Sequence, residues 1–207
     1  MGACCVSDTK THNQKRTSEF QGKKISEVKV NDVHNESQSS KANNMKPNIN
    51  EKEDQILNYI SQGSLHKIEE LVGRGEINVN EYIFGGTETI LHKAVCIGNS
   101  HKIVEYLLDR GANVNSVEMM TKNTSLFFAC VDLKVEMVEV ILNQNPDLEH
   151  KNENGETALE HLENFYFPKK KGETGKTITP EGKKKYDAII DRIEAQKKKM
   201  KYTEKLD

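Results

Sequence analysis

Residues 172–177 read GETGKT, a combination of glycine, lysine and threonine that can hold the phosphates of a nucleotide. A phosphate-binding loop has the spacing G-x-x-x-x-G-K-[ST], follows a buried strand and leads directly into a helix. Here Lys170 stands where the first glycine is required, and no strand is predicted before the loop. We therefore interpret Gly172–Thr177 as an inserted loop and keep nucleotide binding as an alternative.

The N-terminal segment, MGACCVS, carries a second pattern with chemical meaning. Removal of the first methionine makes Gly2 an acceptor for N-myristoylation, and Cys4 and Cys5 behind it are candidates for palmitoylation. The usual motif, M-G-x-x-x-[ST], has a hydroxyl at the sixth residue, whereas Val6 stands there and the serine follows one place later. We predict lipidation at Gly2, Cys4 and Cys5; an unmodified terminus with incidental cysteines is the alternative.

Residues 9–50 are rich in Ser, Asn, Lys, Gln and Glu and show almost no hydrophobic periodicity. Such a segment cannot bury enough apolar surface to offset its ordering entropy, so residues 1–50 are predicted to form a disordered arm. Its basic residues closest to the terminus are Lys15, Arg16, Lys23 and Lys24. Each contributes about 1 kcal/mol of attraction to an anionic leaflet. A membrane contact of the arm is therefore expected; an ordinary solvated linker is the alternative.

The remaining Cys and His residues show no spacing typical of a catalytic or metal-binding site. Cys96 and Cys130 occupy small-residue positions of predicted helices, where a thiol packs as a small apolar group. No Cys/His spacing is that of a zinc site, and His92 has no nucleophile or carboxylate at a catalytic spacing. We expect no catalytic residue, no metal and no cofactor. No run approaches 18 apolar residues, which predicts a cytosolic chain without a membrane span.

Charge is distributed unevenly along the 207 residues, which have 30% charged residues and a mean hydropathy of -0.74. Residues 1–50 carry 8 Lys and Arg against 5 Asp and Glu, whereas residues 51–167 carry 9 against 20. Residues 168–207 carry 13 against 7. The lysine clusters of the C-terminal part have no interleaved aromatic residues for base stacking, and the adjacent acidic middle would repel phosphates. We therefore predict that the protein does not bind nucleic acid.

The elements that would position any site are clearest between Thr89 and Asn115, which read TILHKAVCIGNSHKIVEYLLDRGANVN. This stretch resembles one ankyrin repeat, whose pattern is T-P-L-H-x-A, a helix, a glycine, a second helix and G-A-D-V-N. The resemblance implies structural roles for Thr89 and His92, which bond the backbone of the tight turn in such repeats. Gly111 is expected to end the second helix in a left-handed conformation.

Related segments flank this stretch at regular intervals. His66-Lys67-Ile68 recurs as His101-Lys102-Ile103, 35 residues further on. A third unit runs from Thr124 to Asn152, with Asn145 at the place of Gly111, and a fourth opens at Gly155. The resemblance implies an all-α ankyrin-repeat solenoid of about four helix-turn-helix repeats with hairpin loops, whose outer two repeats act as caps.

The fourth unit is interrupted at Pro168 and continues as a helix from Thr179-Pro180-Glu181. Its apolar stripe consists of Tyr186, Ile189, Ile190 and Ile193. We expect an elongated basic capping helix that frays into the lysines at 197–199. The repeat domain is predicted to span residues 51–200, followed by a frayed tail at 201–207.

Apolar residues in two predicted hairpin tips, Tyr82, Phe84, Met119 and Met120, suggest a partner-binding surface, and packing of these residues against a neighbouring tip or tail is the alternative. The resemblance implies a non-catalytic, monomeric adaptor or scaffold that binds a protein. The N-terminal pattern places it at the cytosolic face of a membrane. A soluble inhibitor of a single enzyme is the alternative function.

Overall fold

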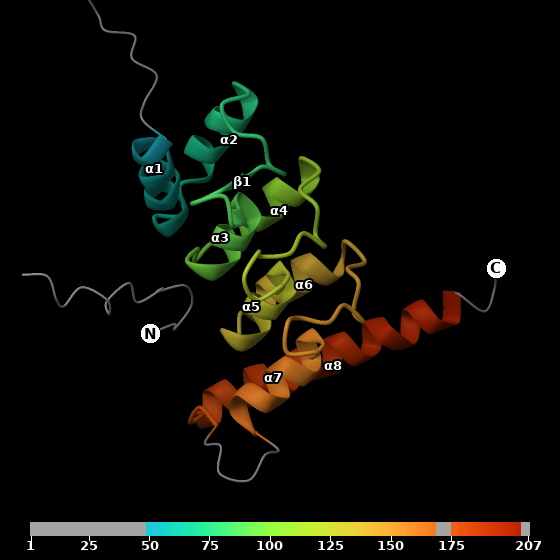
Figure 1. The fold of residues 1–207 in the computed structure, drawn as a ribbon. Helices are drawn as coiled ribbons and strands as arrows, with labels where there is room; N and C mark the ends of the chain where they lie inside the picture. Colours follow the sequence, from blue (N-terminus) through green and yellow to red (C-terminus); the bar gives the residue numbers. More distant parts are fainter. Residues whose placement is uncertain (1–48, 169–174, 204–207) are drawn as a thin grey trace, which may run out of the picture. The chain divides into compact units, whose positions relative to one another are not determined.

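A computed structural model of the chain describes residues 49–168 and 175–203, and this part is mostly helical (Figure 1). The predicted lipidation sites and the basic residues of the N-terminal arm lie outside the described residues. So does the part of the GETGKT loop at 172–174.

The elements follow one another as helix pairs, with one small hairpin between the second and third helices. In chain order they are α1 (Ile49–Ser61), α2 (Leu65–Gly73), β1 (Tyr82–Ile83), β2 (Glu88–Thr89), α3 (Ile90–Cys96), α4 (His101–Asp109), α5 (Ser125–Val131), α6 (Val135–Leu142), α7 (Ala158–Tyr166) and α8 (Pro180–Thr203). The two strands are antiparallel, with Tyr82 opposite Thr89 and Ile83 opposite Glu88. An isolated antiparallel bridge between Val117 and Thr124 lies at the corresponding place of the next unit.

The helices form two layers. The first helix of each pair contacts the first helix of the next, in the order α1, α3, α5, α7. The second helices follow the same order, with α2 against α4, α4 against α6, and α6 against α8. Each pair is therefore covered on its apolar face by the following pair, as the hydrophobic spacing predicted.

The core lies between these layers and consists mainly of aliphatic side chains. In the middle of the stack, Leu91, Leu107, Leu126 and Ile141 are almost fully buried. Cys96 and Cys130 are buried among them, as expected from their small-residue positions. Burial strongly raises the pKa of the Cys130 thiol, because a thiolate would lose its solvation there.

Asparagines tie successive helix pairs together outside the core. Asn80 accepts a hydrogen bond from the Asn113 amide through its Oδ1 at 2.7 Å and donates through Nδ2 to the Gly111 carbonyl at 2.9 Å. One pair further along, Asn115 Oδ1 accepts from the Asp147 amide at 2.9 Å. These bonds give the repeated Asn residues a structural function, because they satisfy backbone groups of the neighbouring turn.

The turns between helices place strict demands on a few residues. Gly111 has a φ of 82° and Asn145 a φ of 49°, so both take the left-handed conformation expected for them. At Gly98 the restriction is steric, since an added Cβ would lie 2.2 Å from the Ala94 carbonyl oxygen. Leu133 takes a positive φ of 54° at the place that corresponds to Gly98.

The last helix, α8, is much longer than the others and packs along α6. Tyr186, Ile189 and Ile193 are buried, while Ile190, the fourth member of the predicted stripe, is half-buried. The helix begins as expected, with the Thr179 hydroxyl accepting from the Gly182 amide at 3.0 Å. It does not end at the lysines at 197–199 but continues to Thr203. An ion pair of 2.9 Å between Lys197 and Glu149 holds this end to the preceding repeat segment.

Candidate functional site

The β1–β2 hairpin places two of the predicted partner-binding residues in a fixed framework. Phe84, Gly85 and Gly86 have consecutive positive φ values of 55°, 72° and 75°. Successive backbone amides in such a turn point to one side and form a small anion-binding concavity. The Glu53 carboxylate of α1 occupies it and accepts from the Phe84 and Gly85 amides at 2.8 and 3.4 Å.

The two aromatic side chains of this hairpin are half-buried. Phe84 packs against the core, and the Lys93 ammonium lies 5.5 Å from its ring centroid. Lys93 is also ion-paired with Glu88, and both side chains are largely buried. The Tyr82 hydroxyl donates to the Val117 carbonyl at 2.9 Å, which joins the hairpin to the next tip. Tyr82 and Phe84 therefore contribute to the packing of the tip.

The second tip, residues 117–124, is organised around one buried carboxylate. Glu118 accepts from the amides of Met120 and Thr121 at 2.7 Å each and from the Thr121 hydroxyl at 2.6 Å. Its side chain is nearly inaccessible, with 7% of the residue exposed. Burial opposes the charge, but these hydrogen bonds and nearby His92 outweigh it and hold the pKa of Glu118 below its ordinary value.

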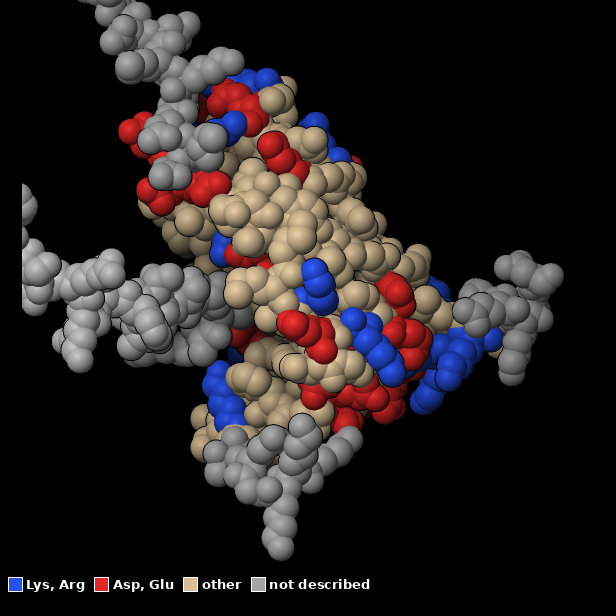
Figure 2. Space-filling view, viewed as in Figure 1, with Lys and Arg blue, Asp and Glu red and all other residues tan. Residues whose placement is uncertain are grey.

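This arrangement leaves two methionine side chains pointing into solvent. Met119 and Met120 are 46% and 71% exposed, and the Met119 amide donates to the Thr87 carbonyl at 3.1 Å. The structure thus brings the four predicted residues to adjacent tips, with the aromatic pair half-buried and the methionine pair exposed. We call Met119, Met120 and the adjoining β1–β2 turn the tip surface. Figure 2 shows a broad uncharged area around the hairpin, with acidic groups grouped near α1 and α2.

Comparison with known families identifies the centre of this architecture. Residues 88–118 match the family model of the ankyrin repeat. This segment is similar to an ankyrin repeat. The matched segment begins in β2, includes α3 and α4 and ends directly before the exposed methionines. Ankyrin repeats are generally non-catalytic modules for protein–protein interaction, so the match indicates such a module. A comparison with curated proteins returns no match to this chain.

Within the ankyrin repeat, Thr89 and His92 have the structural roles that the resemblance implied. His92 Nδ1 accepts from the Thr89 amide at 3.1 Å, and Nε2 donates to the Ser116 carbonyl at 3.0 Å. The ring is fully buried and lies edge-on to Phe128, with centroids 6.0 Å apart. Both ring nitrogens of His92 thereby join the start of α3 to Ser116, the residue directly before the second tip.

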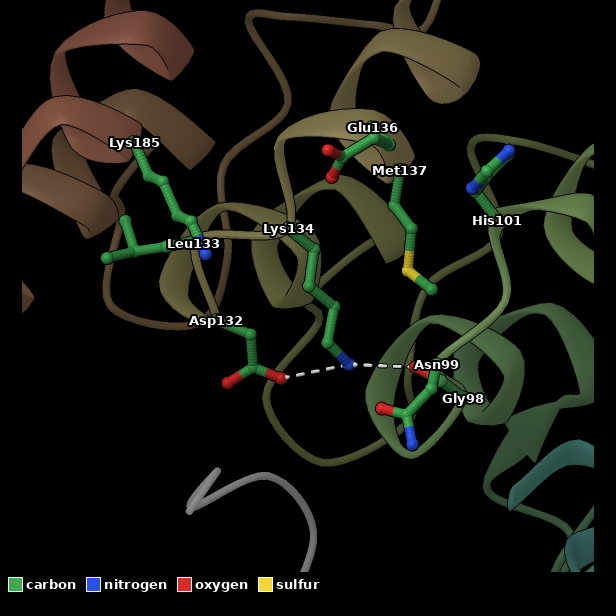
Figure 3. A pocket seen from close by; sticks show the side chains of 9 residues that line it. All are labelled: Gly98, Asn99, His101, Asp132, Leu133, Lys134, Glu136, Met137 and Lys185. Atoms are coloured by element: carbon green, nitrogen blue, oxygen red, sulfur yellow. Dashed lines mark hydrogen bonds and ion pairs between the residues drawn. The ribbon is translucent and has the colours of Figure 1, made fainter. Parts of the chain in front are cut away.

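A hollow of about 210 Å³ lies on the opposite edge of the ankyrin repeat, between the α3–α4 and α5–α6 turns (Figure 3). It is lined mainly by polar and charged side chains: Gly98, Asn99, His101, Asp132, Leu133, Lys134, Glu136, Met137 and Lys185. The described parts of the chain contain no cluster of His, Cys, Asp and Glu that could hold a metal ion. Nor does any described helix have the length and apolarity needed to cross a membrane.

Lys134, which lines this hollow, has a structural role there. Its ammonium donates to the carbonyls of Val95 and Cys96 at 2.5 and 2.7 Å and is 3.4 Å from the Asp132 carboxylate. A cation at the end of α3 satisfies carbonyls that have no partner within the helix. Sequence reasoning missed Lys134, although it stands 35 residues after Asn99 and breaks the resemblance between the two units at that turn.

The described part of the GETGKT loop packs on the end of α7. The Lys176 amide donates to the Phe165 carbonyl at 3.0 Å, and its ammonium lies 5.2 Å from the Phe165 ring centroid. The following helix begins only at Pro180, three residues after Thr177. In a phosphate-binding loop the lysine and threonine lie at the helix start, so this geometry favours the interpretation as an inserted loop.

Proposed function

We propose that the helix pairs form a solenoid of four ankyrin-like repeats, with the first and last acting as caps. The family match at residues 88–118 supports this, and so do the asparagine bonds at an interval of 32 or 33 residues. Such repeats bury their apolar faces only against neighbours, which is the pattern of contacts between α1, α3, α5 and α7. Residues 49–203 then form one domain after an N-terminal arm.

The biological role that this arrangement supports best is that of a non-catalytic adaptor that binds a protein through the tip surface. The observation that carries the proposal is the exposure of Met119 and Met120 on a loop fixed by Glu118. Methionine side chains are flexible and polarizable and fit varied apolar partners. A rigid loop also reduces the entropy that binding must overcome.

Proximity labelling from the intact chain in cells tests this role. The double substitution Met119→Ser and Met120→Ser should remove specific labelled proteins and leave the thermal midpoint of unfolding nearly unchanged, because the side chains are exposed. Tyr202→Ser, at an exposed apolar residue on α8, is the matched control. Identical labelling by both variants and the wild type would contradict a binding role of the tip surface.

The adaptor is further proposed to be tethered to the cytosolic face of a membrane through its N-terminal arm. A single myristoyl chain on Gly2 gives a partition constant of only about 10⁴ M⁻¹, so a second signal is needed. Acylation of Cys4 and Cys5 and the basic residues Lys15, Arg16, Lys23 and Lys24 would supply it.

Cell fractionation distinguishes these contributions. Gly2→Ala should make most of the protein soluble, whereas Cys4→Ser with Cys5→Ser should leave a weak association that salt removes. A Gly2→Ala protein that stays with membranes to the wild-type extent would contradict the acyl anchor. Binding of Mg-nucleotide that is lost in Lys176→Ala would contradict the non-catalytic role.

A further inference from the structure

The corner where α7 ends and α8 begins exposes an aromatic ring among lysines. Phe167 is 47% exposed and is one of four large apolar side chains that face solvent in the described part of the chain. Its ring is nearly perpendicular to that of Tyr186, with centroids 5.4 Å apart. The Lys183 ammonium lies 4.8 Å from the Tyr186 centroid and 5.9 Å from that of Phe167.

The corner is basic although the preceding domain is acidic. Residues 175–187 contain Lys176, Lys183, Lys184 and Lys185 against Glu181 and Asp187, whereas residues 51–167 carry 9 basic and 20 acidic residues. All four lysines are exposed, and Lys183 is paired with Asp187. The stem of a lysine can lie along an aromatic ring while its ammonium stays in water.

A rigid frame holds Phe167 in its exposed position. Tyr166, next to it, is buried and donates its hydroxyl to the Val131 carbonyl at 2.8 Å. The backbone of Gly175 passes so close to the Tyr166 carbonyl oxygen that an added Cβ would lie 2.0 Å away. Because the position of Phe167 is already fixed, its contact with a ligand costs little conformational entropy.

We propose that this corner, defined by Phe167, Lys176, Lys183 and Lys184, is a contact site for an anionic lipid bilayer. The aromatic ring enters the interfacial region and the ammonium groups meet acidic headgroups, which is the combination that holds peripheral proteins at membranes. The site is independent of the N-terminal acylation proposed above and lies on a different part of the chain.

Binding of the corner to a bilayer would also determine which edge of the domain faces the membrane. The first helices begin at the tips and end at the inter-helix turns, and Gly182 at the start of α8 lies beside Leu133 in the α5–α6 turn. The corner therefore belongs to the edge formed by the C-terminal ends of α3, α5 and α7. A bilayer bound there leaves the tip surface, at the opposite ends of these helices, accessible to a partner.

Vesicle sedimentation with the full chain, produced without acylation, tests the proposal. Binding is expected to phosphatidylcholine vesicles that contain about 30% phosphatidylserine and not to phosphatidylcholine alone. Phe167→Ser should lower the partition constant about tenfold, because the ring loses its apolar contact. Lys176→Gln with Lys184→Gln should lower it about 25-fold, at about fivefold for each charge.

A matched control is Lys198→Gln with Lys201→Gln, which removes the same charge from the far end of α8. Its effect should be clearly smaller than that of the corner variant; equal losses would show that the whole helix attracts lipid and would overturn the proposal. Lys184 has an exposed side chain, so Lys184→Gln alone provides a variant with wild-type folding if Phe167→Ser proves unstable. A retained thermal midpoint confirms that each variant is folded.

The contribution of the arm is measured separately by replacing Lys15, Arg16, Lys23 and Lys24 with Gln. If these changes abolish vesicle binding while Phe167→Ser binds like the wild type, the corner site is refuted and the proposed arm contact stands. If the corner variants lose binding and the arm variant keeps most of it, the corner is supported. The competing ligand is a single-stranded DNA of about 20 nucleotides. If the protein binds this DNA in preference to vesicles, the corner is a nucleic-acid surface and the assignment is overturned.

Discussion

Phe84 and Met119 stand at equivalent places of successive repeat units, 35 residues apart, yet their side chains differ in environment. Phe84 is half-buried beneath Lys93, in a turn whose amides are bound by Glu53 from α1. Met119 is exposed, on a loop whose amides are bound by Glu118 from within the loop. A carboxylate from α1 fixes the first tip, whereas a carboxylate within the loop fixes the second tip and leaves its methionine side chains exposed.

The largest effect is expected from removal of the internal carboxylate. Glu118→Ala leaves three donors without their acceptor in a nearly inaccessible position and should lower the free energy of unfolding by about 3 kcal/mol. Urea denaturation of the full chain measures it. A loss below about 1 kcal/mol would show that water replaces the carboxylate and that the loop is not fixed from within.

A direct comparison of the two tips should give the next largest effect. Phe84→Ala removes a half-buried ring and should cost about 2 kcal/mol, whereas Met119→Ala should stay within about 0.5 kcal/mol of the wild type. The same denaturation measurement applies to both variants. Equal losses would mean that Met119 is a packing element like Phe84, and the distinction between the tips would then fail.

The external carboxylate is expected to contribute less, because it accepts two amides at the rim of the domain. Glu53→Ala should lower the free energy of unfolding by about 1 kcal/mol and increase hydrogen exchange at the Phe84 and Gly85 amides. Asp54→Ala, at the adjacent exposed residue, provides a control on α1. Unchanged exchange at Phe84 in Glu53→Ala would contradict the anchoring role.

The smallest effect concerns the pH dependence of stability. The pKa of Glu118 is held below its ordinary value, so its ionised form stabilises the fold above about pH 4.5, and this contribution is lost as the pH falls through the lowered pKa. The difference in unfolding free energy between the wild type and Glu118→Gln should therefore shrink as the pH falls below about 4.5 and through the lowered pKa. A constant difference would show that Glu118 is not ionised in the folded loop.

The sequence determined the helix pairs of the central units. Identities at an interval of 35 residues and apolar spacing of helical period fix which face each helix buries, because a repeat unit must match its neighbours. Thr89, His92, Gly111 and Asn145 were assigned correctly for the same reason, since each satisfies a local backbone requirement. The lipidation pattern at Gly2, Cys4 and Cys5 stays a prediction.

Tertiary structure alone decided which apolar tip residues face solvent. Equivalent positions in successive units differ here even in backbone geometry, since Phe84 has a φ of 55° and Met119 has no positive φ. Their exposure also depends on groups that are distant in sequence, such as Glu53 for Phe84. Lys134 shows the same limit, because its ammonium satisfies carbonyls of α3 about 40 residues earlier in the chain. Sequence periodicity specifies what a repeat shares with its neighbours, whereas long-range contacts to individual side chains determine how one repeat differs from the next.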